Sequence, residues 1–230
     1  HAPKPIVKLT ALKPAAVEHI TLTNRSGTLK LAKQNGRWQL LAPLQIAANG
    51  VRVDDLLQVA EAESHSQFSA PGKGLAPFGL DKPSVTLRLN DTELKFGGTT
   101  PVDQQRYVQI GDVIHLIDDR YSFDLDAAAD AYVSRDLVPS GAELSAIALP
   151  GFSLSRGKDG KWSATPMPHG ASPEKMQERV KALADAWRGA QALRVAAYDK
   201  RPAQGTVGLT LAGGQTPLRY AIIARQPELI

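Results

Sequence analysis

Apolar and polar residues alternate along several short segments of the chain, and this period of two predicts half-buried β-strands. The first two segments are residues 19–23 and 28–32, and a third begins at Trp38. Asn35 and Gly36, which both tolerate positive φ, stand before the third segment and form a strong hairpin signal. The pattern therefore predicts an antiparallel sheet of successive hairpins at the start of the chain.

The period then lengthens to that of an α-helix. Val53, Leu56, Leu57 and Ala60 recur at helical spacing, so together they would form one apolar face. Asn49 precedes them and is a suitable N-cap, because its side chain can accept a hydrogen bond from the first turn. This segment therefore predicts an amphipathic helix.

Alternation returns in the next part of the chain. The expected strands are residues 85–89, 94–96, 106–110 and 113–117. Short turns such as Gly111-Asp112 join these segments, so they predict a four-stranded antiparallel meander. Residues 119–137 follow and are predicted to be helical, because Phe123, Leu125 and a run of alanines occur there.

The same order of signals then appears a second time. The matching positions are Gly36 and Gly160, Trp38 and Trp162, Pro43 and Pro166, and Val85 and Val207. Ser172, with Pro173 at the first helical position, starts a second predicted helix between the matching tryptophan and valine. Because the spacing between matching positions is nearly constant, the pattern indicates an internal duplication.

These patterns together predict an α+β protein of two tandem similar units, each an antiparallel sheet with a helix packed on one face. The first unit is expected over residues 18–138, and the second, shorter unit over residues 144–230. Residues 1–17 contain prolines and lysines and are expected to form an extended lead-in. Since the chain opens on His1 rather than on Met, we expect the lead-in to follow a removed signal or anchor.

Composition narrows the classes of partner. The chain has 27 basic and 23 acidic residues, a net charge of +4 at pH 7, and these charges are interspersed. A nucleic-acid-binding arm would carry a run of basic residues, and a single-strand binder would interleave them with aromatic residues. Neither pattern occurs, so we expect no nucleic-acid partner.

The chain has no cysteine, which excludes disulfides, thiolate catalysis and cysteine-ligated zinc. Its five histidines, at positions 1, 19, 65, 115 and 169, show no metal-ligand spacing. The acidic residues at 118, 119, 124 and 126 lack the glycine turn and the later glutamate of a calcium loop. No strained G-x-S-x-G serine elbow occurs either. The sequence therefore predicts no catalytic residue, no cofactor and no metal ligand.

Several motifs carry a resemblance to a known family. They are Gly36-x-Trp38-x-Leu40-x-x-Pro43, Phe78-Gly79-Leu80-Asp81-x-Pro83, and Gly97 followed by Arg106-Tyr107-Val108. With them the chain resembles the bacterial domain of unknown function 4340 over residues 18–200. The resemblance implies a periplasmic domain that an N-terminal helix tethers to the inner membrane. It also implies a membrane protein partner, such as a component of a gliding-type ABC transporter, and it implies no catalytic residue.

The string from Phe78 to Pro83 is the most distinctive in the chain and has two interpretations. In the first, Gly79 is the left-handed cap of a helix end and Pro83 precedes a strand. In the second, the string is an exposed loop that docks a partner. The second interpretation gives the candidate partner or ligand surface, which comprises Phe78, Leu80, Asp81, Arg106 and Tyr107.

Three functions follow as hypotheses. The first is a non-enzymatic extracytoplasmic interaction module that serves a membrane transport or envelope assembly, with unpaired strands at the sheet edges recruiting a partner. The second is a periplasmic lipid- or glycan-binding protein that uses a groove between the two repeats. The third is a hydrolase, which would need several converging polar side chains with perturbed pKa values.

Overall fold

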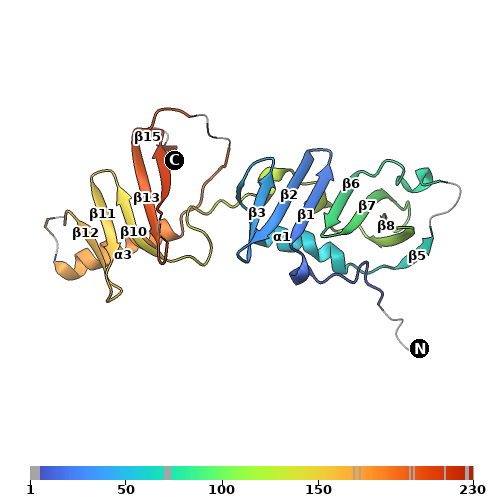
Figure 1. Cartoon of the computed structure of the whole chain (residues 1–230), viewed down its shortest axis with the longest axis horizontal. Helices are drawn as coiled ribbons and strands as arrows, with labels where there is room; N and C mark the ends of the chain where they lie inside the picture. Colours follow the sequence, from blue (N-terminus) through green and yellow to red (C-terminus); the bar gives the residue numbers. More distant parts are fainter. Residues whose placement is uncertain are drawn as a thin grey trace. The chain divides into compact units, whose positions relative to one another are not determined.

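The computed structural model of the chain (Figure 1) describes residues 6–69, 74–167, 169–170, 172–196, 198, 200–214, 216–225 and 228–229. The chain divides into two compact units, His1–Ser134 and Arg135–Ile230. Each contains an antiparallel sheet and few helices, so the predicted α+β class is confirmed. Val138, which the sequence assigned to the first unit, lies in the core of the second unit.

The described residues of unit 1 form a nine-stranded antiparallel sheet with the strand order β4-β3-β2-β1-β6-β7-β8-β9-β5. The strands are β1 (His19–Asn24), β2 (Gly27–Gln34), β3 (Arg37–Ala42), β4 (Ile46–Ala47), β5 (Ser66–Ser69), β6 (Val85–Leu89), β7 (Thr92–Thr99), β8 (Gln105–Ile110) and β9 (Val113–Asp118). The predicted hairpin between β2 and β3 turns at Asn35 and Gly36, whose φ angles are 51° and 75°. The predicted meander is β6 to β9, and β5 adds a strand at its far edge.

Helix α1 (Gly50–Leu57) continues into the 3₁₀ helix η2 (Gln58–Glu61) and covers part of the sheet of unit 1. The Asn49 side chain accepts a hydrogen bond from the Arg52 backbone N–H at 3.3 Å, so the predicted N-cap is confirmed. The apolar residues Val53, Leu56, Leu57 and Ala60 are all buried.

The prediction of a helix over residues 119–137 is wrong. Only the short helix α2 (Ser122–Leu125) and the 3₁₀ helix η4 (Ala129–Tyr132) form there. The Asn24 amide donates to the carbonyls of Leu125 and Ala127 at 2.8 and 2.9 Å, and the Tyr132 hydroxyl donates to the carbonyl of Asp124 at 2.6 Å. Side chains therefore satisfy carbonyls that a continuous helix would use, and they hold this segment in separate turns.

The N-terminal segment from residue 6 belongs to unit 1. The Leu9 N–H donates to the Ala62 carbonyl at 2.8 Å, and the side chains of Leu9 and Val17 are buried. The 3₁₀ helix η1 (Pro14–Ala16) lies between these two residues, directly before Val17. Residues 1–5 of the expected lead-in lie outside the described residues.

The described residues of unit 2 form a five-stranded antiparallel sheet with the order β12-β11-β10-β13-β14, and a separate two-stranded sheet. The elements are β10 (Leu144–Leu149), β11 (Phe152–Arg156), β12 (Trp162–Thr165), α3 (Pro173–Arg188), β13 (Gly205–Leu211), β14 (Leu218–Ile222), β15 (Ala224–Arg225) and β16 (Glu228–Leu229). As predicted, Ser172 caps α3, because its hydroxyl accepts from the Lys175 N–H at 3.5 Å.

One face of α3 completes the core of unit 2. Met176, Val180 and Ala184 recur at helical spacing and are buried against apolar residues of the sheet. The sheet contributes Leu144, Ile147, Leu154, Ala164, Val207 and Leu209. The opposite face of α3 carries charged residues, as expected for an amphipathic surface helix.

A turn of backbone lies directly on the sheet of unit 1. The 3₁₀ helix η3 (Ala76–Phe78) ends at Gly79, whose φ is 66°, so the left-handed cap predicted there is present. A Cβ atom added to Gly97 of β7 would lie 2.2 Å from the Phe78 carbonyl oxygen. One added to Gly79 would lie 2.9 Å from the backbone nitrogen of Gly98. Only glycine allows this contact between the two backbones.

We expect Gly97→Ala to lower the free energy of unfolding by about 1–3 kcal/mol, because the new methyl group must displace backbone. Gly98→Ala is the matched control, since its Cβ would lie 3.7 Å from its nearest neighbour, the Phe78 carbonyl oxygen. That substitution should change stability by less than about 0.5 kcal/mol. Urea denaturation of the two variants measures the difference, and equal losses would contradict the packing described.

Candidate functional site

Two residues of the sequence-predicted surface lie in an aromatic cluster on unit 1. The ring centroids of Phe78 and Tyr107 are 5.0 Å apart, and the rings meet edge to face. Phe68, on β5, lies 5.5 Å from Phe78. The sequence analysis missed Phe68, because only the pairing of β5 with β9 brings it to this place. All three rings are half-buried.

The other candidate residues separate from this cluster. Asp81 is exposed, whereas Leu80 is buried under the turn with only 2% of its surface accessible. Arg106 neighbours Tyr107 on β8, so its side chain leaves the strand on the opposite face of the sheet. Arg106 is 9% exposed and therefore does not form part of a docking surface.

Arg106 instead joins three segments of unit 1 through its guanidinium. Its Nε donates to the Gly97 carbonyl at 3.3 Å, and Nη2 donates to the Ser84 hydroxyl at 2.9 Å. Nη1 donates to the Asp119 carboxylate at 3.2 Å and to the Ser122 hydroxyl at 3.0 Å. Because a planar guanidinium has donors fixed in a fork, one side chain can orient β7, β9 and α2 at once.

His115 on β9 is a buried polar residue of the same sheet. It is 7% exposed, and its Nδ1 lies 3.0 Å from the Ser64 hydroxyl. Burial lowers the pKa of His115, because the protonated ring loses solvation. The structure places His115 in a buried cross-strand position opposite Val108.

Three acidic residues at and after the end of β9 have structural partners. Asp118 lies 2.9 Å from His65 Nε2, Asp119 accepts from Arg106, and Asp124 lies 2.8 Å from Arg52 Nη1. Their carboxylates therefore point to different places and do not converge. Within the described part of the chain, no group of three or more potential metal-ligating side chains could hold a metal ion.

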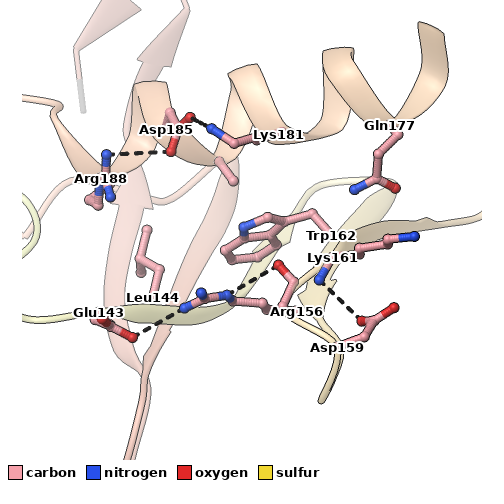
Figure 2. A pocket seen from close by; sticks show the side chains of 12 residues that line it. Glu143, Leu144, Arg156, Asp159, Lys161, Trp162, Gln177, Lys181, Asp185 and Arg188 are labelled. Atoms are coloured by element: carbon pink, nitrogen blue, oxygen red, sulfur yellow. Dashed lines mark hydrogen bonds and ion pairs between the residues drawn. The ribbon is translucent and has the colours of Figure 1, made fainter. Parts of the chain in front are cut away.

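A groove in unit 2 runs between α3 and the sheet (Figure 2) and has a volume of about 470 Å³. We call it the Trp162 groove. It is lined by Glu143, Leu144, Arg156, Asp159, Gly160, Lys161, Trp162, Gln177, Lys181, Ala184, Asp185 and Arg188. The five helical residues follow one side of α3, since they recur at spacings of three and four. The β11–β12 turn and the start of β10 form the other wall.

Ion pairs neutralise most of the charge in the Trp162 groove. Asp185 lies 2.6 Å from Lys181 Nζ and 3.5 Å from Arg188 Nη2, and Arg156 Nη1 lies 3.1 Å from Glu143. The hydrogen bond from Lys181 lowers the pKa of Asp185, so this carboxylate stays ionised near neutral pH. The Arg156 Nε also donates to the Gly160 carbonyl at 3.3 Å.

Trp162 stands between the two walls of the groove. Figure 2 shows its indole ring with Lys181 and Asp185 on one side and Arg156 on the other. The ring packs partly on the core of unit 2 and remains half-buried. Trp38, which stands at the matching position of the sequence pattern, is only 6% exposed. The two tryptophans occupy matching positions of the sequence pattern, but they differ in exposure.

We expect Arg106→Met to lower the free energy of unfolding by about 2–3 kcal/mol, because it leaves the Asp119 carboxylate without its guanidinium in a largely buried place. The exposed Arg88 on β6 provides the control, and Arg88→Met should change stability by less than about 0.5 kcal/mol. Thermal and urea unfolding of both variants check this. Similar stability of the two variants would show that Arg106 does not hold these segments together.

We expect His115 to make stability depend on pH. Its pKa is lower in the folded chain than the ordinary value of 6.5, so the unfolded chain binds more protons between the two pKa values. Stability should therefore fall as pH drops below about 6.5, by at most about 1.4 kcal/mol per pH unit. His115→Asn should remove this slope, whereas the variant His19→Asn of an exposed histidine should keep it. Parallel slopes in all three proteins would contradict the assignment.

Comparison with known protein families identifies the same family that the sequence motifs resemble. The family model described as Domain of unknown function (DUF4340) matches residues 38–206. This range runs from Trp38 through the glycine contact and the Arg106 cluster to the start of β13. No curated protein and no solved structure matches the chain. Because the match covers well over half of its residues, the chain belongs to the DUF4340 family.

Proposed function

We propose that the chain is a non-enzymatic interaction module that recruits an extended segment of a partner protein to the open edge of its second sheet. The observation that carries this proposal is the apolar side of β14, which the described residues leave partly exposed. In unit 1 the corresponding strand, β7, pairs with β8 on its outer side. Among the described residues, β14 pairs with β13 alone and ends its sheet.

The correspondence between β7 and β14 rests on the two strand orders. Unit 1 contains the order β3-β2-β1-β6-β7, and unit 2 has β12-β11-β10-β13-β14. In both, three strands follow one another, a helix comes later in the chain, and a strand after that helix, β6 or β13, pairs with the first of the three. We infer that the two units are copies of one α+β fold, each with a helix packed on its sheet, as the matching sequence signals also suggest.

The side chains of β14 suit a partner strand. Leu218, Tyr220 and Ile222 alternate along it and pack on the core of unit 2, yet each stays partly exposed. A strand added beside them would bury more of this apolar surface and would satisfy the outward backbone groups of β14. The opposite edge strand, β12, offers less apolar surface, because Ser163 and Thr165 are exposed there.

The polar groups that could have suggested catalysis already have structural partners. Arg106 binds three segments, His115 contacts Ser64, and the carboxylates of Asp118, Asp119 and Asp124 have separate partners. In the Trp162 groove the acidic and basic side chains pair with one another. Catalysis would need such groups to be held ready for a substrate, so this arrangement favours a binding role.

The proposal extends to location and partner through the family resemblance. We place the module in the periplasm, tethered to the inner membrane by an N-terminal helix, beside a membrane protein such as an ABC transporter component. Within the described residues, no helix combines the length and apolar character that a membrane crossing requires. The tether is therefore part of the proposal and is tested with it.

A photo-crosslinking amino acid in place of Arg219, an exposed residue of β14, tests the docking edge. The full-length protein is produced in its native membrane, irradiated and purified in mild detergent. We expect one membrane-protein partner to be attached at stoichiometric yield. The matched control replaces Ser153, an exposed residue of β11 that has a strand on each side.

If the partner crosslinks with equal yield from positions 219 and 153, the contact is non-specific and β14 is not the docking edge. Irradiated protein that carries no partner from either position would reject the interaction module. Recovery of the protein from the aqueous fraction after cell lysis would reject the tether alone.

A further inference from the structure

The Trp162 groove has a lining chemistry of its own and is separate from the β14 edge. The groove and the edge lie in the same unit but share no residue. The volume of about 470 Å³ falls in the range of about 300–1,000 Å³ that is usual for small-ligand sites. The sequence hypothesis of a glycan site placed it between the repeats, whereas this groove lies wholly within unit 2.

Trp162 supplies a flat apolar surface at a place where a ligand can reach it. Its ring is half-buried, so it can bury further area against a ligand without unfolding the core. Within the described part of the chain, its indole N–H has no hydrogen-bond partner, and neither has the side-chain amide of Gln177. Figure 2 shows Gln177 one turn along α3 from Lys181, with its amide directed toward the side of the groove where Trp162 lies.

The charges of the groove disfavour two ligand classes. A lipid tail needs an apolar lining, but nine of the twelve lining residues, all except Leu144, Gly160 and Ala184, are polar, charged or carry an N–H donor. A free anion needs unpaired cations, but Arg156, Lys181 and Arg188 all have carboxylate partners within 4 Å. Lys161 is the remaining cation, and in Figure 2 its ammonium group points away from Trp162.

A neutral sugar ring suits the groove, which offers the accessible Trp162 ring and polar side chains around it. The C–H face of a pyranose with equatorial hydroxyls is flat and apolar, and it can stack on an indole ring. Its hydroxyls both donate and accept, so they can bond to ion-paired carboxylates and to cations without disturbing the charge balance. Ion pairs that hold Arg156 and Asp185 in place also reduce the entropy lost when a ligand binds.

We propose that the Trp162 groove binds a neutral glycan, with a pyranose ring stacked on Trp162 and its hydroxyls bonded to Gln177, Asp185 and Arg156. The ligand class is a β-linked oligosaccharide, whose sugar rings present their C–H faces in a flat ribbon. This site would let the module contact an envelope glycan while the β14 edge holds a protein partner.

The test titrates the intact chain with the β-1,4-linked tetrasaccharides of glucose and of N-acetylglucosamine, and follows tryptophan fluorescence and calorimetry. Trp162→Leu should weaken binding at least about tenfold, because it removes the stacking surface but keeps an apolar side chain on the core. The matched control is Trp187→Leu, since Trp187 is a half-buried residue of α3 that packs on the same core but does not line the groove. It should bind as the unaltered chain does.

A second readout separates a neutral glycan from an anion. Affinity for the tetrasaccharide should change by less than about twofold between 0.05 and 0.5 M NaCl, because screening acts only between charges. Binding of inorganic phosphate without binding of either tetrasaccharide would overturn the proposal. So would equal affinity in the Trp162→Leu and Trp187→Leu variants, or the absence of binding of both sugars. Thermal unfolding of each variant confirms that it is folded.

Discussion

Each unit depends on one non-local strand pairing. In unit 1 the second strand after α1, β6, returns to pair with β1, and in unit 2 the first strand after α3, β13, returns to pair with β10. The helix between them is amphipathic and must cover a sheet face to bury its apolar side, so the chain cannot continue as a simple meander. Buried apolar residues face one another across both pairings: Leu22 lies opposite Leu87, and Ile147 lies opposite Leu209. β7 pairs with β6, and β14 pairs with β13, so the position of each depends on this non-local pairing.

The two units differ in the elements that surround this pairing. In unit 1, β7 is followed by β8 and β9, and the Phe78 turn and the Arg106 guanidinium fasten these strands to one another. In unit 2 the described sheet ends at β14, and α3 is twice as long as α1. The longer helix packs on the core with one side and forms one wall of the Trp162 groove with the adjoining side. Polar side chains of unit 1 therefore connect its own strands, whereas the described part of unit 2 has an edge strand and a groove.

Local signals predicted those elements whose boundaries are set by a few neighbouring residues. The Asn35-Gly36 turn, the Asn49 and Ser172 caps and the left-handed Gly79 are of this kind, since each depends on its own backbone geometry. The helix predicted over 119–137 does not form because side chains take its carbonyls. Asn24, which is distant along the chain, bonds to the carbonyl of Leu125, and Tyr132, within the segment itself, bonds to that of Asp124. Arg106 was assigned to a surface because alternation alone does not tell which face of a fully covered strand is buried. The Trp162 groove could not be foreseen, since Trp38 and Trp162 stand in the same sequence pattern and differ only in what packs around them.

The central claim is that β14 is an open edge that a partner strand completes. Amide hydrogen exchange of β14, measured in the isolated chain and again in the complex extracted from native membranes, tests it most directly. The account predicts that the β14 amides exchange readily in the isolated chain and become protected in the complex, while those of β10, which has strands on both sides, exchange slowly in both. If β14 exchanges at the same rate in the isolated chain and in the complex, the edge is not the docking site and the account is wrong.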